Sequence, residues 1–193
     1  MRISRLNVVD CYEFEPNLFE DNRGYFMEVF RESHLQSLGL DQRFVQENHL
    51  YSKFAGTLRG IHYQLPPYEQ AKLVRCIRGS IYDVVIDLRR DSPTFLQHAA
   101  VELTSDNRKQ LYVPAGCGHA FMTLVPDTEV LYKTDAYYAP EHEAGIHWSD
   151  HQLNISWPAL KPVLSQKDEQ LPVFQFARLP GVKGGINDGE KVR

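Results

Sequence analysis

Cysteine is scarce in this sequence, and the few cysteines are not arranged for cross-linking. Cys11, Cys76 and Cys117 are odd in number and form no C-x-x-C pair. A disulfide framework needs paired cysteines, and a thiolate zinc site needs closely spaced ones. We therefore expect three reduced thiols that serve mainly in packing.

Long hydrophobic runs are also absent. No apolar stretch approaches the ~18 to 20 residues that cross a bilayer, and the first residues lack the apolar block of a signal peptide. Positive charge is not in excess, because 21 Lys and Arg stand against 25 Asp and Glu, giving a net charge of −4. We expect a cytoplasmic protein that binds neither membranes nor, over a broad surface, nucleic acid.

Apolar material is plentiful, with 42% hydrophobic and 11% aromatic residues in a chain of 193. This is enough for one sizeable core, so we predict a single domain over residues 1–180. Residues 181–193 contain four of the twelve glycines. They have almost no large apolar side chains, which predicts a flexible C-terminal tail.

Short apolar runs bounded by Gly, Pro, Asn and Asp recur along most of the chain, which is typical of all-β proteins. A single segment reads as a helix, from Ser33 as N-cap to Gly39 as C-terminal breaker. Eight or more strands indicate a barrel or jelly roll with one or two short peripheral helices. The predicted strands are 44–48, 57–64, 72–78, 80–88, 99–103, 110–113, 120–124 and 128–134.

The segment 80–88 alternates in a way that leaves two interpretations open. One face is wholly apolar, whereas the other carries Asp83 and Asp87 among aliphatic residues. That mixed face either lines a cavity or lies on a solvated outer sheet. Gly79 favours a tight turn before this strand, so we predict that 72–88 forms a β-hairpin.

Two segments contain histidines that could carry chemistry. His62 lies in a strand with Gln64 on its face, and is either a general base or a buried, hydrogen-bonded histidine. Strict alternation places Arg59 on the opposite face, so both reach one ligand only if the strand begins late or bulges at Gly60. His119 ends a P-x-G-x-x-H pattern similar to the second motif of cupin barrels.

The cupin pattern lacks its metal-binding half. After His62 the chain reads Tyr63-Gln64, so the second imidazole of an H-x-H motif is missing. Because a metal site needs three or four protein ligands, we predict none here and interpret His119 as a ligand-binding or a structural turn residue. Taken singly, Lys72 reads as a solvated strand residue and Tyr132 as a packed one.

Nine segments together resemble the dTDP-4-dehydrorhamnose 3,5-epimerase family, over about residues 12–168. The family resemblance implies a metal-free, cupin-type jelly roll that needs no cofactor. It also implies that the protein is an isomerase acting on a dTDP-linked 4-keto-6-deoxyhexose. The matching segments are 19–28, 45–49, 56–64, 71–75, 91–95, 110–114, 131–133, 137–140 and 164–168.

The same resemblance implies the catalytic roles. The expected reaction inverts C3 and C5 of dTDP-4-dehydro-6-deoxy-D-glucose, whose protons there are acidified by the C4 ketone. His62 is the base, oriented by Asp168, and Lys72 stabilises the enolate oxygen. Tyr132 returns a proton from the opposite face, because a base on one face alone would regenerate the substrate.

The carrier nucleotide needs partners, and these too come from the resemblance. It also implies a homodimer in which each site receives a strand from the partner subunit. Forked guanidinium donors suit the diphosphate. The residues assigned to substrate binding are Arg23, Phe26, Glu28, Gln46, Asn48, Arg59, His119, Tyr138, Glu143 and Lys167.

The sequence departs from the family pattern at Cys117, which replaces a bulky aromatic residue, and at His98 and Ala99. We expect these positions near the wall or base of the pocket, where they bear on the number of inverted centres. A single-centre epimerase, a metal-dependent cupin oxidoreductase and a non-catalytic nucleotide-sugar-binding cupin are the alternatives.

Overall fold

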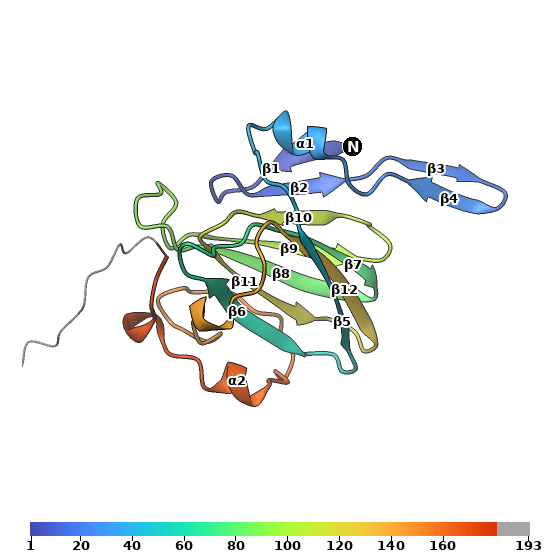
Figure 1. Ribbon diagram of the computed structural model, residues 1–193. Helices are drawn as coiled ribbons and strands as arrows, with labels where there is room; N and C mark the ends of the chain where they lie inside the picture. Colours follow the sequence, from blue (N-terminus) through green and yellow to red (C-terminus); the bar gives the residue numbers. More distant parts are fainter. Residues whose placement is uncertain (181–193) are drawn as a thin grey trace, which may run out of the picture.

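The computed structural model describes residues 1–180, so the predicted tail lies outside the described residues. Two antiparallel sheets face each other, with a separate two-stranded arm (Figure 1). The first sheet has the order β1 (Arg2–Arg5), β2 (Tyr12–Glu15), β10 (Gln110–Val113), β7 (Lys72–Arg78), β12 (Thr128–Thr134) and β5 (Gln46–Ser52). The second has the order β13 (Glu143–Gly145), β6 (Leu58–Gln64), β11 (Cys117–Thr123), β8 (Ser80–Asp87) and β9 (His98–Thr104).

The remaining elements are short and peripheral, as predicted. Strands β3 (Leu18–Asp21) and β4 (Gly24–Met27) pair to form the arm. The helices of the described chain are α1 (Glu32–Gln36) and α2 (Gln166–Glu169), with 3-10 turns η1 (Pro140–His142) and η2 (Phe174–Phe176). No helix in residues 1–180 has the length and apolar character of a membrane span.

The core lies between the two sheets. Val74, Leu111 and Val130 of the first sheet pack against Ile81 and Val85 of the second, all with 1% exposure or less. Burying an aliphatic side chain of this size contributes about 1.5 to 3 kcal/mol. The three cysteines also lie in this cluster as free thiols, which confirms their predicted state.

Each sheet is also covered on its outer face. Leu35 of α1 packs with Tyr12, Phe14 and Tyr112 over the first sheet. The C-terminal segment, orange to red in Figure 1, covers the second sheet, where Leu153 joins a cluster with residues of β6 and β8. Both strand faces are therefore buried over much of the barrel, and one end remains for a site.

The predicted hairpin over 72–88 is wrong. Strands β7 and β8 belong to different sheets and do not pair with each other. Gly79 has the positive φ expected of a tight turn, at 79°. The turn nevertheless carries the chain from one sheet to the other, because apolar alternation identifies a strand and not its partner.

The predicted helix is found, with a shifted start. Helix α1 begins at Glu32, and Arg31, not Ser33, occupies the N-cap position without a side-chain bond. Gly39 follows the helix with a φ of 75°, as expected of a C-terminal breaker. Strands 72–78, 110–113 and 128–134 are confirmed at their predicted bounds.

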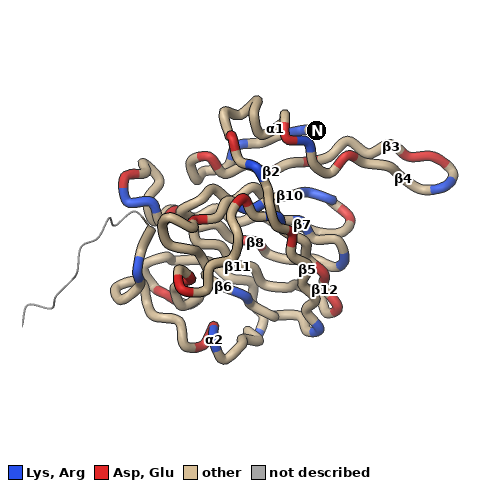
Figure 2. The backbone as a smooth tube through the Cα atoms, viewed as in Figure 1, with Lys and Arg blue, Asp and Glu red and all other residues tan. Residues whose placement is uncertain are grey.

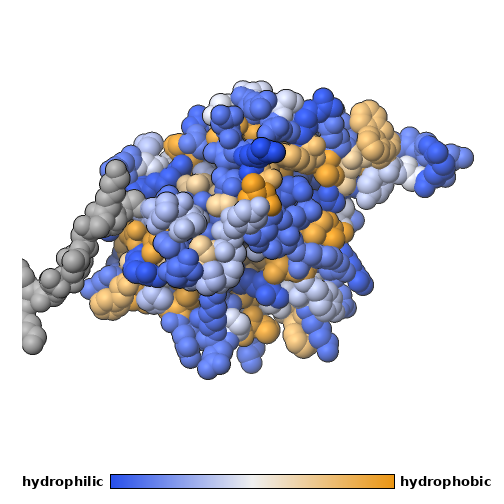
Figure 3. Space-filling model, viewed as in Figure 1, coloured by the Kyte–Doolittle hydropathy of each residue, from blue (hydrophilic) through white to orange (hydrophobic). Residues whose placement is uncertain are grey.

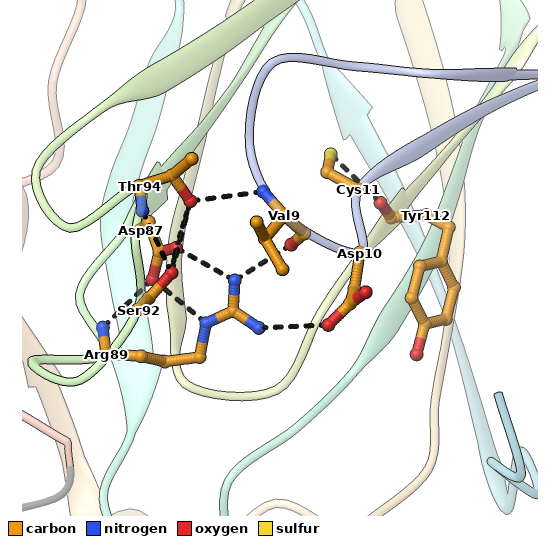
Figure 4. A network of polar contacts seen from close by, with 8 residues as sticks. All are labelled: Val9, Asp10, Cys11, Asp87, Arg89, Ser92, Thr94 and Tyr112. Atoms are coloured by element: carbon orange, nitrogen blue, oxygen red, sulfur yellow. Dashed lines mark hydrogen bonds and ion pairs between the residues drawn. The ribbon is translucent and has the colours of Figure 1, made fainter. Parts of the chain in front are cut away.

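A polar network surrounds Asp87 and Arg89 (Figure 4). Asp87, at the end of β8, accepts hydrogen bonds from Arg89, Ser92 and Thr94 on both carboxylate oxygens. Arg89 also donates to the backbone oxygen of Val9, over 2.8 Å. The network therefore fastens the N-terminal loop to the connection between β8 and β9.

The arm leaves the body of the protein (Figure 1). Asp21 and Arg23 lie at its tip and form an ion pair, visible as red and blue in Figure 2. Behind the hydrophilic tip, Figure 3 shows hydrophobic side chains, and Phe19 and Phe26 are 61% and 69% exposed. Exposed aromatic residues on a projecting hairpin are typical of a protein contact.

Candidate active site

A cavity of about 280 Å³ opens between the two sheets. Side chains from both sheets line it, and α2 closes one side. The lining residues are Leu50 of β5, Arg59 and His62 of β6, Lys72 of β7, His119 and Phe121 of β11, Tyr132 of β12, and Ser165, Lys167 and Asp168 at α2.

A bulge in β6 brings Arg59 and His62 to the same cavity. The register with β11 shifts at this point, since His62 lies opposite His119 and Arg59 lies opposite Phe121. Gly60 has a φ of 117°, and a Cβ there would lie 2.6 Å from the backbone oxygen of His119. The bulge at Gly60 that the sequence left open is therefore present, and it requires glycine.

His62 is held by a carboxylate from α2. Its Nε2 lies 2.6 Å from Oδ1 of Asp168, whose other oxygen accepts a hydrogen bond from the Ser165 hydroxyl over 2.7 Å. Ser165 also caps α2 by accepting from the Asp168 backbone N–H. Burial raises the pKa of Asp168, but hydrogen bonds from His62 and Ser165 outweigh it and lower the pKa overall. The carboxylate stays ionised and fixes the ring.

Lys72 and Tyr132 face His62 from the first sheet. Burial lowers the pKa of Lys72 to about 8, against the charges of Asp83 and Glu143, which favour the ammonium. Burial also raises the pKa of the Tyr132 hydroxyl, and the charge of Glu143 adds to the rise. At neutral pH the cavity therefore has a cation and a protonated phenol opposite an imidazole.

His119 has a carboxylate partner of its own, which the sequence did not identify as part of a site. Its Nε2 lies 2.6 Å from Oδ1 of Asp83, which is fully buried on the inner face of β8. Asp83 shares this face with Ile81 and Val85 of the core, so the mixed face of 80–88 points into the barrel. The signal was the carboxylate among aliphatic residues, whereas its partner lies 36 residues further on.

Five of the residues assigned to nucleotide binding form a chain of contacts at the cavity rim. Gln46 donates to Asn48 and accepts from the backbone N–H of Tyr138. The Tyr138 hydroxyl donates to Glu143 over 2.6 Å, and Lys167 donates to the same carboxylate over 2.5 Å. A second recess of about 290 Å³, lined by His62, Glu143 and Lys167 among others, adjoins the cavity.

The other three lie elsewhere. Arg23 and Phe26 are on the arm, and Glu28 follows it, paired with Arg31 at 2.6 Å. None of them is among the lining residues of the cavity. Within one chain, the structure therefore separates these residues from the site to which they were assigned.

The departures from the family pattern also lie away from the cavity lining. Cys117 is 2% exposed and packs in the core between the sheets. His98 and Ala99 are on β9, at the far edge of the second sheet from β6. None of the three is among the lining residues of the cavity, although Cys117 lies two positions before His119 on β11, and β11 and β8 stand between β9 and β6. Among residues 1–180, no group of three or more His, Cys, Asp or Glu side chains is arranged to hold a metal ion.

Comparison with known proteins agrees with this geometry. The model of the dTDP-4-dehydrorhamnose 3,5-epimerase family matches residues 5–175. The chain belongs to this family. It is therefore an isomerase with the cupin-like jelly roll predicted from the sequence. The dTDP-4-dehydrorhamnose 3,5-epimerase of Shigella flexneri is 44% identical over 87% of this chain and 93% of its own length.

Solved structures match over nearly the whole described chain. The Bacillus anthracis epimerase with TDP and PPi bound is 47% identical, with a TM-score of 0.86, over 89% of this chain and 98% of that one. A 3'-monoepimerase of Streptomyces bikiniensis in complex with dTDP-quinovose is 38% identical, with a TM-score of 0.81, over 87% and 85%. The fold thus accommodates both double and single inversion.

Proposed function

We propose that this protein inverts C3 and C5 of dTDP-4-dehydro-6-deoxy-D-glucose, giving dTDP-4-dehydro-L-rhamnose. The observation that carries the proposal is the cavity. His62 with Asp168 stands on one sheet side, and Tyr132 and Lys72 stand on the other. A substrate between them has a base on one face and an acid on the other, as inversion requires.

Each inversion begins at His62. Asp168 engages Nε2, so Nδ1 takes the proton from the carbon beside the ketone. The electron pair of the C–H bond forms the C=C bond of an enolate, and the ketone oxygen becomes negative. The Lys72 ammonium stabilises that oxygen in a cavity shielded from water, which is worth several kcal/mol, about 3 for one well-placed donor.

Tyr132 completes the inversion. Its hydroxyl gives a proton to the opposite face of the carbon, where the electron pair of the C=C bond forms the new C–H bond. A lone pair of the enolate oxygen re-forms the C=O bond, and a tyrosinate remains. His62 is then protonated and Tyr132 is not, so both exchange with solvent before the next inversion. Because its pKa is raised, Tyr132 regains its proton readily at neutral pH.

The rim of the cavity fits a nucleoside diphosphate. Arg59 and Lys167 supply donors for the diphosphate, His119 lies beside them in the cavity lining, and Gln46 and Asn48 supply amides. Tyr138 is 52% exposed at this rim, with its ring free to stack on the base. Support also comes from the Bacillus anthracis relative, whose structure contains TDP.

Deuterium exchange tests the reaction. The protein is incubated with dTDP-4-dehydro-6-deoxy-D-glucose in D2O, and NMR follows C3 and C5, with His62→Asn as control. We expect deuterium at both carbons, reduced about 10²- to 10⁴-fold in the variant. Uptake at one carbon identifies a single-centre epimerase, the second candidate, which the Streptomyces bikiniensis relative favours. No uptake with intact binding identifies a nucleotide-sugar-binding cupin.

We also propose that the protein acts as a homodimer with exchanged arms. Arg23, Phe26 and Glu28 do not reach their own cavity, and the arm exposes Phe19 and Phe26. Seated on a second copy, the arm buries these rings and adds a guanidinium to the partner's nucleotide site.

Mixed dimers test the exchange. His62→Asn disables the cavity and Arg23→Ala disables the arm, so one site of a mixed dimer combines an intact cavity with an intact arm. We expect random mixing of the two variants to restore about a quarter of the wild-type rate. If each arm served its own chain, mixing would restore nothing.

A further inference from the structure

We propose that Asp83 is a positioning residue of the reaction, holding the His119 ring and keeping Lys72 positively charged from inside the barrel. The inference rests on the proposed function, in which Lys72 stabilises the enolate and His119 lines the substrate cavity. It adds to that site a carboxylate that touches no substrate.

The placement of Asp83 is unusual for a charged residue. It lies on the inner face of β8 between Ile81 and Val85, with no exposed surface. Oδ1 contacts Nε2 of His119 at 2.6 Å, whereas Oδ2 is buried with no hydrogen-bond partner among residues 1–180. Buried polar atoms normally have partners, so a carboxylate left with one contact requires an explanation.

The contact with His119 fixes what this ring offers to a ligand. A carboxylate at Nε2 accepts the N–H there, so the tautomer is set and the ring cannot rotate freely. Nδ1 is left for the cavity. His62 also has a carboxylate beside Nε2, since Oδ1 of Asp168 lies 2.6 Å away, and the two histidines lie opposite each other across β6 and β11.

Asp83 also lies close to the cavity that Lys72 lines, because its partner His119 lines the same cavity. Burial drives the pKa of Lys72 down, and Asp83 is the larger of the two charges that oppose this, the other being Glu143. Glu143 already accepts from Lys167 and Tyr138. Within the described residues, Asp83 has a hydrogen bond with His119 and no other.

The other titratable and charged groups around Lys72 do not replace Asp83. Asp168 is engaged by His62 and Ser165. Asp135 accepts from the backbone N–H of Ala71. The other ionisable side chains that line the cavity carry no negative charge that could stabilise the Lys72 ammonium. They are Arg59, His62, His119, Lys167 and Tyr132.

Asp83→Asn tests the proposal, with Asp87→Asn as a matched control. Both changes remove one buried charge from the same face of β8, but Asp83 contacts His119 of the cavity lining, whereas Asp87 is bonded by Arg89, Ser92 and Thr94, which are outside that lining. We expect the alkaline limb of kcat in Asp83→Asn to move down by about one pH unit, which lowers kcat above pH 8 about tenfold. We also expect a higher KM through His119. Asp87→Asn should keep the wild-type profile.

A second measurement needs no substrate. The ¹³Cε signal of Lys72, assigned with Lys72→Met, reports its titration in wild type and Asp83→Asn, and should move in the same direction as the kcat limb. The ¹⁵N signals of His119 in wild type should show the proton on Nε2. These spectra distinguish failure of this inference from failure of the epimerase assignment, which the deuterium experiment decides.

Two results would overturn the proposal. One is an unchanged Lys72 titration in Asp83→Asn, or an equal shift in Asp87→Asn, which would make the effect one of general structure. The other is a His119 proton on Nδ1 in wild type, which remains decisive if Asp83→Asn does not fold.

Discussion

Two aspartates on one strand show how this barrel separates stability from chemistry. Asp83 and Asp87 lie four positions apart on the inner face of β8, and neither has exposed surface. Asp87 has donors on both oxygens, from Arg89, Ser92 and Thr94. Asp83 has His119 on one oxygen and, within residues 1–180, no hydrogen-bond partner on the other. A buried carboxylate therefore has hydrogen-bond partners on both oxygens at Asp87 but, among the described residues, on one oxygen at Asp83.

The difference follows from what surrounds each carboxylate. Asp87 faces a fork of guanidinium donors that only fastens loops together, so its burial is compensated in the folded state. Asp83 contacts the cavity residue His119, and in the same cavity Lys72 has no ion-pair partner among the described residues. A buried carboxylate that is incompletely paired lowers the stability of the fold. We attribute its presence beside this cavity to the proposed reaction, which uses its negative charge.

The largest effect on stability is expected when the fully hydrogen-bonded Asp87 is replaced. Asp87→Ala leaves the Arg89 guanidinium without its main partner and should lower the free energy of unfolding by about 3 to 5 kcal/mol. Urea denaturation at pH 7 measures this, with the exposed Asp91→Ala as control, expected within about 0.5 kcal/mol. The folded fraction should keep its turnover. A large loss of kcat per folded molecule would contradict the assignment of Asp87 to stability.

The same variant also tests how the free energy of unfolding depends on pH at acid pH. Burial raises the pKa of Asp87, but bonds from Arg89, Ser92 and Thr94 outweigh it and lower the pKa. A folded pKa below the unfolded value of 3.8 contributes stability at higher pH, which is lost as pH falls through the folded pKa. Stability measured below pH 4 should therefore fall less steeply in Asp87→Ala than in wild type.

A substitution at Lys72, in the cavity, is expected to change the free energy of unfolding in the opposite direction. The pKa of Lys72 falls from 10.5 to about 8 on folding, so the unfolded chain binds more protons between these values and stability rises with pH there. Lys72→Met should raise the free energy of unfolding at pH 7 by about 2 to 3 kcal/mol, remove the rise between pH 8 and 10.5, and abolish turnover. Urea titrations over this range measure it. A destabilised variant would show that Lys72 is structurally favourable.

The difference between local patterns and long-range contacts explains how much of the structure the sequence predicted. Strands such as 72–78 and 128–134 follow from alternation and turn residues, which are local. Pairing is not local, so the hairpin of β7 with β8 was wrong. Asp83 stood out among aliphatic residues, but its partner lies on β11 and no spacing connects them. The family resemblance supplied His62, Lys72, Tyr132 and Asp168, which the cavity brings together, and also Arg23 and Phe26, which lie on the arm.

The smallest effect is expected at Ser165, which gives Asp168 the second contact that Asp83 lacks. Its hydroxyl donates to Oδ2 of Asp168 over 2.7 Å and accepts from the Asp168 backbone N–H over 3.1 Å. Ser165→Ala removes the N-cap of α2 and should cost about 1 kcal/mol of stability. If that energy is needed in the transition state, kcat falls about fivefold.

Comparison of Ser165→Ala with Ser165→Thr separates the two roles of the hydroxyl, because threonine keeps both bonds. We expect wild-type kcat in the threonine variant and a raised acid limb of kcat in the alanine variant, since Asp168 loses a donor that lowers its pKa. If kcat is unchanged in Ser165→Ala, Asp168 orients His62 with one satisfied oxygen alone. In that case a single contact, such as the one Asp83 makes with His119, is enough to position a histidine in this cavity.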